Sequence, residues 1–195
     1  IEATAGGELD ELRFRYVNGT VFPKYVTLSS LDYAGEYLDR LPDALTGLLE
    51  NEEDSTLLAL ADDVESADML ALVIDVERVL NDDNSLGVSA YFPILQAVDD
   101  TEVVLVATKA DILADQFEND RGIQAHRYFD DFQEYVNAEL MESENIRSLV
   151  QETAGADIHP VYYQTKEDDT GEKVPMRNER GSVMTVGFEE LLQKL

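Results

Sequence analysis

The 195-residue sequence contains no cysteine. Without thiols the chain has no disulfide framework, no thiolate nucleophile and no zinc site built on cysteine. Histidine is also scarce, since His126 and His159 are the two in the sequence, far apart and outside any HExxH spacing. We therefore expect both histidines to be structural and expect no metal centre built on histidine.

Basic residues are few and are not clustered. Fourteen lysines and arginines stand against 42 aspartates and glutamates, which gives a formal net charge of −28. Binding of nucleic acid or of an anionic membrane through a basic patch is therefore not expected, because no cluster can neutralise phosphates. No stretch approaches the ~20 apolar residues of a transmembrane segment. No signal peptide is visible in the chain as given.

The acidic residues are scattered over every segment instead of being gathered in a tail. Uniform acidity is typical of a surface adapted to molar salt, where a Debye length of about 3 Å screens self-repulsion. The composition resembles that of proteins from halophilic archaea. It implies a cytoplasmic protein whose contacts with a membrane, where they exist, are made through partners. Acidic pairs along the chain are interpreted first as solvated surface.

Polar residues end the most apolar stretch of the chain. Residues 103–107 are apolar and mostly β-branched, which predicts a strand buried on both faces of a parallel sheet. Thr108, Lys109 and Asp111 follow, and ligands of open α/β sheets bind outside such strand ends. A carboxylate there can accept two N–H bonds from a purine edge, while a lysine stem covers the ring. The alternative is an ordinary solvated turn.

A second polar segment follows a predicted hairpin. Residues 12–17 alternate apolar and basic side chains, Asn18-Gly19 is a strong hairpin signal, and a second strand is expected over residues 21–28. Asp32 and Gly35 come next, an acid at a strand end and a glycine three positions later. Gly35 can bring its backbone N–H against an anion because it has no side chain. Alone, the pattern also fits a turn that caps the next helix.

The remaining pattern alternates helices and strands. Leucines at helical spacing predict a helix over residues 37–49, with Pro42 in a first turn or at a kink. Further elements are expected as helices from 55, over 88–98, within 112–156 and over 188–195, and as strands over 69–75, 158–166 and 182–186. We predict one α/β domain over residues 1–195, with a mostly parallel central sheet, helices on both faces and one antiparallel edge hairpin in three layers.

Three polar segments together resemble the motifs of P-loop GTPases with a Ras-like, TRAFAC-type G domain. Thr108-Lys109-Ala110-Asp111 resembles the guanine-specificity motif Asn-Lys-x-Asp, with threonine in the asparagine place. Asp32 and Gly35 match Asp-x-x-Gly, and Thr165-Lys166 loosely matches the short loop whose backbone N–H meets the guanine carbonyl. The motifs occur in the family's order, each after a predicted strand.

The resemblance implies GTP or GDP with Mg²⁺ as cofactors. Asp111 would read the guanine N–H and amine, and Lys109 would cover the base. Asp32 would hold Mg²⁺ through a water, and Gly35 would sense the γ-phosphate and move the following segment for protein effectors or regulators. Glu36 stands where many relatives have the glutamine that orients the attacking water. Because its carboxylate would repel the γ-phosphate, hydrolysis would be slow or use another residue.

One motif of the family is absent from the sequence. No Gly-x-x-x-x-Gly-Lys-Ser/Thr occurs, so no loop can cradle a β-phosphate in the family's way. The family's loop lies upstream of the hairpin and the chain starts at Ile1, so we expect the N-terminal strand, phosphate loop and first helix to be missing from it. Two functions stay open: a switch that hydrolyses GTP to GDP, and a catalytically silent pseudo-GTPase that acts as a protein-interaction module.

Overall fold

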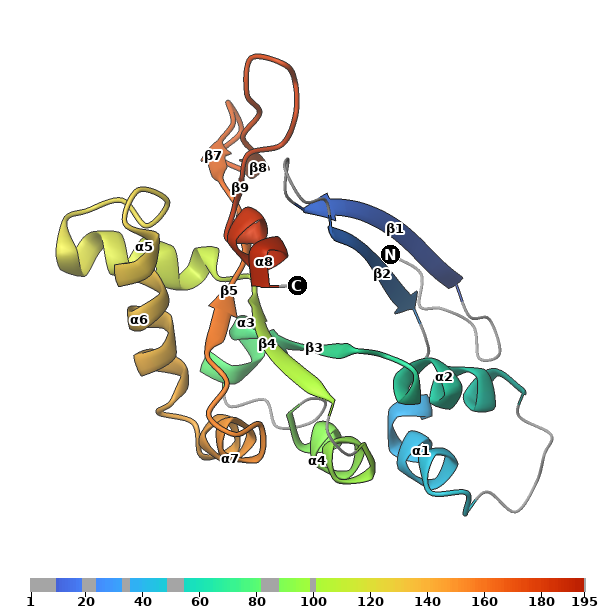
Figure 1. Cartoon of the computed structure of the whole chain (residues 1–195). Helices are drawn as coiled ribbons and strands as arrows, with labels where there is room; N and C mark the ends of the chain where they lie inside the picture. The colour runs from blue at the N-terminus through green and yellow to red at the C-terminus, as the bar shows by residue number, and fades with distance from the viewer. Residues whose placement is uncertain are drawn as a thin grey trace. The chain divides into compact units, whose positions relative to one another are not determined.

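The computed structural model describes residues 10–18, 24–32, 36–48, 55–81, 88–98 and 101–194, with the backbone alone for 10–18, 24–32, 36, 37, 39, 89 and 90. The described chain is mixed α/β, as predicted (Figure 1). It divides into two compact units, one of Ile1–Leu70, Ala90–Glu102 and Leu195, the other of Ala71–Ser89 and Val103–Lys194. The expectation of a single domain stays a prediction.

The first unit contains the predicted antiparallel hairpin. β1 (Asp10–Asn18) pairs with β2 (Lys24–Asp32) along its whole length, from Asp10 opposite Asp32 to Asn18 opposite Lys24. The described part of the second strand runs from Lys24 to Asp32, past the predicted end at residue 28. The predicted start at residue 21 lies outside the described residues and stays a prediction.

Helices of the first unit pack through leucines, as their spacing predicts. They are α1 (Glu36–Leu45), α2 (Ser55–Glu65) and most of α4 (Val88–Ala97), from Ala90 onward. Their buried cluster is Leu41, Leu57, Leu60, Ala61 and Ile94. α1 ends before the predicted residue 49. Gly47 takes a left-handed φ of 69°, and the Leu48 N–H donates to the Asp43 carbonyl at 2.8 Å, a Schellman end that stops the helix.

The central sheet has three parallel strands in the order β3 (Met69–Asp75), β4 (Glu102–Thr108) and β5 (Ile158–Pro160). Residues 104–107 of β4 and all three residues of β5 are buried. Because successive side chains of a strand point to opposite faces, both faces of these two strands are covered. The prediction of a parallel sheet covered on both faces is confirmed for β4 and β5.

Five helices of the second unit surround these strands. They are α3 (Val76–Leu80), α5 (Asp111–Arg121), α6 (Phe129–Leu140), α7 (Glu144–Glu152) and α8 (Phe188–Lys194). α5 and α6 lie side by side (Figure 1), and Phe117 and Phe132 meet edge to face with ring centroids 5.6 Å apart. Phe132 also meets Tyr162 at 5.7 Å. Within the described ranges, none of the helices is both long and apolar enough to cross a membrane.

Side-chain amides of α6 cover the edge of β5. Asn137 Oδ1 accepts from the Ile158 N–H and Asn137 Nδ2 donates to the Ile158 carbonyl, both at 3.1 Å, and Gln133 Nε2 adds a third bond at 3.2 Å. An edge strand exposes backbone groups that can pair with another chain. Here two amides of a helix take the place of the next strand, so β5 ends the parallel sheet on this side.

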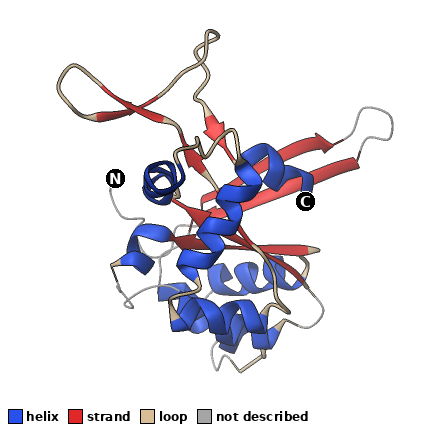
Figure 2. Cartoon of the chain, turned by 90° about the vertical axis from the view of Figure 1, so that its left-hand side faces the viewer, coloured by secondary structure: helices blue, strands red, loops and turns tan. Residues whose placement is uncertain are grey.

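The single strand predicted over residues 158–166 is three short strands. After β5, β6 (Tyr162–Tyr163) pairs antiparallel with β9 (Thr185–Val186), and β7 (Thr165–Glu167) pairs antiparallel with β8 (Lys173–Pro175). Residues 162–186 form what we call the β arm, which includes the return strand predicted within residues 182–186. Its branches separate in Figure 2, where the two tan loops diverge at the upper end of the view.

Three backbone bonds join the branches of the β arm in a cycle. The Gln164 N–H donates to the Met184 carbonyl, Met184 donates to Met176, and Met176 donates back to Gln164, at 2.9, 2.9 and 2.8 Å. Each strand segment therefore contacts both others at one point. The arm is fixed at its junction by main-chain bonds, although few of its side chains are buried.

Both loops of the β arm use the same turn chemistry. Asp168 Oδ1 accepts from the backbone N–H groups of residues 170 and 172 at 2.8 and 3.0 Å, and Asn178 Oδ1 accepts from those of residues 180 and 182 at 2.9 and 3.1 Å. Gly171 and Gly181 each take a φ of 82°. An Asx side chain followed by a left-handed glycine is typical of a short hairpin loop. The described loops of residues 167–181 are therefore ordered turns.

Candidate functional site

Polar side chains gather at the carboxyl end of the parallel sheet, as the sequence predicts. We call Asp75, Glu77, Thr108, Lys109 and Asp111 the carboxyl edge. Thr108 ends β4, and its Oγ1 donates to the Ile74 carbonyl of β3 at 3.2 Å. The threonine hydroxyl thus joins the ends of two neighbouring strands. Sequence reasoning placed this residue at the edge and did not predict the bond.

Lys109 is held by two carboxylates, Asp75 at the end of β3 and Glu77 in α3. Its ammonium lies 2.7 Å from Glu77 Oε2 and 3.0 Å from Asp75 Oδ2. The hydrogen bond to Glu77, followed by that to Asp75, raises the pKa of Lys109, so the side chain stays charged. Asp75 also accepts from the backbone N–H of Arg78 at 3.3 Å and caps α3. The ammonium is therefore fixed at the end of β3 and the start of α3.

The backbone at Lys109 is unusual. Its φ of 55° lies in the left-handed region, which residues with a side chain rarely occupy. Such conformations persist where the surrounding structure enforces them, and they cluster at ligand sites. Here the two carboxylate contacts and the strand end hold the residue. The strained residue, Lys109, lies within the Thr108–Asp111 segment that the sequence predicts to bind a ligand.

Asp111 is the first residue of α5 and is partly buried. Desolvation raises the pKa of its carboxyl, and the nearby Asp115 and Glu77 raise it further, while its backbone N–H and Lys173 act in the opposite direction. The folded protein therefore holds this carboxylate at a cost to its stability. A titratable group held in this way at a strand end is a candidate for function.

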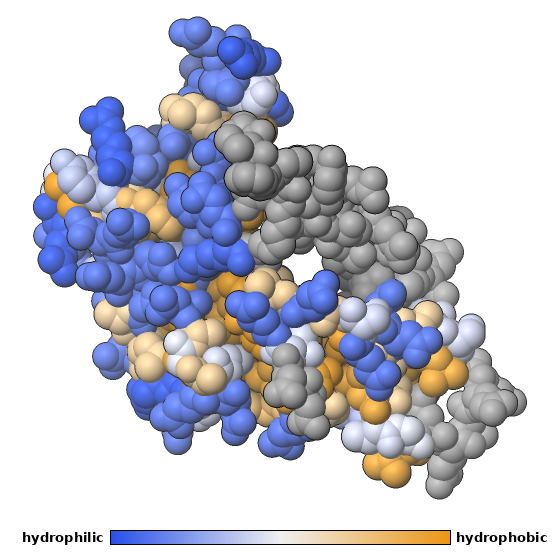
Figure 3. Space-filling model, viewed as in Figure 1, coloured by the Kyte–Doolittle hydropathy of each residue, from blue (hydrophilic) through white to orange (hydrophobic). Residues whose placement is uncertain are grey.

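The β arm reaches α5 close to Asp111. The Lys173 ammonium lies 2.7 Å from Asp115 Oδ2, and Asp115 is one helical turn after Asp111, on the same face of α5. Tyr162, at the base of the arm, is buried, and burial raises the pKa of its phenol, with Glu118 and Asp111 adding to the effect. The surface over the arm and α5 is mostly hydrophilic on the face drawn in Figure 3.

Thr165 and Lys166 both lie in β7, not in a loop. The Asp168 N–H donates to the residue 172 carbonyl at 2.9 Å, so these two residues are a hydrogen-bonded pair of the antiparallel ladder. Hydrogen-bonded and non-hydrogen-bonded pairs alternate along such a ladder, so Lys166 and Val174 are the next hydrogen-bonded pair. The Lys166 N–H is therefore directed at β8. Thr165 faces Pro175, which has no N–H, at a position without ladder bonds. Of the two predicted residues, Thr165 has the backbone N–H that points away from β8.

The residues predicted for the phosphate end belong to the first unit. Asp32 is the last residue of β2 and Glu36 the first of α1, with backbone alone described, and Gly35 lies outside the described residues. The roles assigned to them stay predictions. Among the side chains that the structure does describe, no group of three or more histidines, aspartates and glutamates is placed to hold a metal ion, and Asp32 is not one of those side chains.

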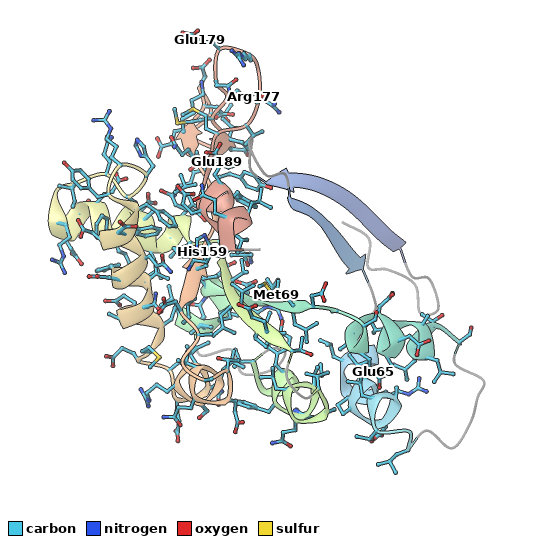
Figure 4. All side chains as sticks on the ribbon, viewed as in Figure 1. Glu65, Met69, His159, Arg177, Glu179 and Glu189 are labelled. Carbon is cyan, nitrogen blue, oxygen red and sulfur yellow. The ribbon has the colours of Figure 1, made fainter. Side chains whose placement is uncertain are left out.

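His159 has a structural role, as predicted. It is fully buried in β5, and its Nε2 bonds the Gly187 carbonyl at 2.6 Å (Figure 4). Burial lowers its pKa, so the ring is neutral and Nε2 is the donor. Nδ1 has no partner among the described atoms. The bond fixes the start of α8 against β5. His126 is exposed.

Lys173, Asp75 and Glu77 are members of the site that sequence reasoning did not assign. Asp75 ends a predicted strand next to β4, and that position was the available signal for a partner of Lys109. Lys173 gave no such signal, because it is 58 positions from Asp115 and is brought there by the β arm.

Comparison with protein-family models, with curated proteins and with solved structures found no match to this chain. The resemblance to P-loop GTPases therefore rests on the sequence motifs alone. The function that this edge supports follows as a proposal.

Proposed function

We propose that the chain carries the guanine-reading part of a GTP-binding switch protein of the P-loop GTPase kind. The observation that carries the proposal is the arrangement of Lys109 and Asp111 at the end of β4. The Lys109 ammonium is fixed 2.7 Å from Glu77 and 3.0 Å from Asp75, so it is directed to β3. The lysine stem is then available to cover a base, and Asp111 to read its edge.

Asp111 supplies the chemistry of discrimination. Its carboxylate accepts the N1–H and the 2-amino N–H of guanine, whereas adenine presents an unprotonated N1 that repels a carboxylate. The raised pKa of Asp111 is consistent with such a ligand, because two N–H donors would favour the ionised form that burial disfavours. Thr108 completes the edge structurally through its bond to Ile74.

In the full reaction that we propose, GTP is hydrolysed to GDP with Mg²⁺. Asp32 would hold the ion through a water, and the segment after Gly35 would change position for protein effectors in the cytoplasm. A phosphate loop outside this chain is required. The second candidate is a catalytically silent interaction module, which is favoured by the lack of that motif in the chain and by Glu36 in place of a water-orienting glutamine.

The test uses nucleosides, because their binding does not depend on a phosphate loop. Guanosine and adenosine are titrated into the ¹⁵N-labelled chain in molar KCl, with wild type and Asp111→Asn. Wild type should bind guanosine at least about tenfold more tightly than adenosine, as expected for a bidentate contact. In Asp111→Asn the preference should move to xanthosine, whose O2 and N1–H match an amide.

A matched control is Asp131→Asn, the same substitution at an exposed position of α6. It should keep the preference of wild type for guanosine. Equal affinity of wild type for guanosine and adenosine would contradict the proposal, as would an Asp111→Asn variant that still prefers guanosine.

A further inference from the structure

The guanine edge needs one more partner than Asp111 provides. Beside the N1–H and the 2-amino group lies the carbonyl oxygen O6, an acceptor that requires a donor from the protein. Lys109 directs its ammonium to Asp75 and Glu77. The Lys166 N–H faces β8. Neither of these two groups is placed to serve O6 without leaving its partner. The Thr165 N–H points away from β8 and can supply one donor, and O6, which has two lone pairs, accepts a second.

Lys173 is a donor beside Asp111. Its ammonium bonds Asp115 Oδ2 at 2.7 Å, one turn of α5 after Asp111, and its charge stabilises the Asp111 carboxylate. An ammonium carries three N–H donors, so the contact with Asp115 leaves donors for a ligand. The side chains of Lys173 and Asp115 are 54% and 66% exposed. Exposed ion pairs contribute little to stability, so the ammonium can turn toward a base at small cost.

The β arm fixes where this lysine lies. Lys173 stands opposite Glu167 in the β7–β8 hairpin, and that hairpin is closed by the Asp168 turn. At the other end of the hairpin, the backbone cycle of Gln164, Met176 and Met184 joins it to the rest of the arm. Main-chain bonds thus fix the hairpin that carries Lys173, and the ion pair with Asp115 places the lysine beside α5, as a residue that reads a ligand requires.

We propose that Lys173 is a specificity-determining residue of the base site and donates a hydrogen bond from its ammonium to guanine O6. The proposal rests on the proposed function and extends it, because it makes the β arm part of the nucleotide site. Adenine presents an amino group at the same position, and an ammonium has no lone pair with which to accept its N–H. Lys173 and Asp111 would therefore reject adenine at two adjacent groups.

A cycle of base analogues and variants tests the contact. Guanosine is compared with 6-thioguanosine, in which a weakly accepting sulfur replaces O6 while N1–H and the 2-amino group are kept. Wild type should bind guanosine about tenfold more tightly than the analogue, as expected for a bond from a charged donor. In Lys173→Met this ratio should fall toward one. Lys173→Arg, which keeps charged donors, should retain a larger ratio than Lys173→Met.

Arg180→Met is the matched control, because it removes one positive charge from an exposed position of the same arm. It should keep the wild-type ratio. An unchanged ratio in Lys173→Met overturns the proposal, as does an equal loss of affinity for both nucleosides or an equal ratio in Lys173→Met and Lys173→Arg. If wild type prefers guanosine and loses that preference with Asp111→Asn, these results overturn only the role of Lys173. If wild type has no preference, both proposals fall.

Discussion

Replacing Gly187 with alanine tests the joint between β9 and α8. Gly187 has a φ of 82°, and a Cβ built on it would lie 2.0 Å from the Pro160 carbonyl oxygen and 3.2 Å from Phe129 Cε2. Gly171 has the same φ of 82° with nothing within 4 Å of its Cβ position. Because the two glycines have the same φ, comparing alanine at the two positions separates the cost of backbone strain from the cost of steric conflict.

The expected costs differ because only Gly187 contacts another strand. A left-handed alanine costs about 1–2 kcal/mol, which is the whole effect expected for Gly171→Ala. Gly187→Ala must also move backbone and break the 2.6 Å bond to His159, leaving a buried ring without a partner. That loss adds about 1–3 kcal/mol. We expect Gly187→Ala to destabilise the protein by about 3 kcal/mol or more.

Urea unfolding in molar KCl, followed by circular dichroism, measures both variants against wild type. The difference between the two free energies of unfolding is the steric term. If the variants agree within about 0.5 kcal/mol, the error range of such comparisons, the close packing of Gly187 on Pro160 is refuted.

Three further predictions use the same unfolding assay. Stability should fall below about pH 6.5, by up to about 1.4 kcal/mol per pH unit, because the His159 pKa is lowered by burial and the unfolded chain binds the proton first. His159→Phe should show a shallower fall between pH 7 and 5.5, and an equal slope would contradict the assignment. Asp111→Asn should raise the urea concentration at the unfolding midpoint at pH 7, because the pKa of Asp111 is higher in the folded than in the unfolded protein and its negative charge therefore opposes folding. A lower urea midpoint would contradict this assignment. Asn137→Leu should cost about 1–3 kcal/mol because the Ile158 N–H loses its acceptor, and a neutral result would show that this edge needs no cover.

The sequence predicts well where one local pattern decides the structure. The apolar run before Thr108 identifies a strand buried on both faces, and leucine spacing identifies the helices that pack around Leu41. The position of Lys109 and Asp111 at the sheet edge follows from that strand alone. Local pattern also gives the hairpin, although its second strand continues past the predicted residue 28 to Asp32.

Contacts between distant segments are what the sequence could not supply. Residues 158–166 have one β-rich pattern, yet they pair with three different strands. The pairing partner changes from β4 to β9 at Val161 and from β9 to β8 at Gln164, whose backbone bonds to both Met184 and Met176. Non-local pairing decides such breaks, not local propensity. Likewise, the link between Lys173 and Asp115 depends on the folded β arm. The partners of a site residue are therefore harder to predict than the residue itself.

We expect a guanine base to lie against the Lys109 stem at the end of β4. The most direct measurement is the set of intermolecular nuclear Overhauser effects between guanosine and the labelled chain in molar KCl. The expected result is a set of effects from guanine H8 to the Lys109 methylene protons. Effects instead to the ring protons of Tyr163 and Phe188, a partly exposed stacked pair with centroids 5.7 Å apart, would place the base elsewhere and contradict it.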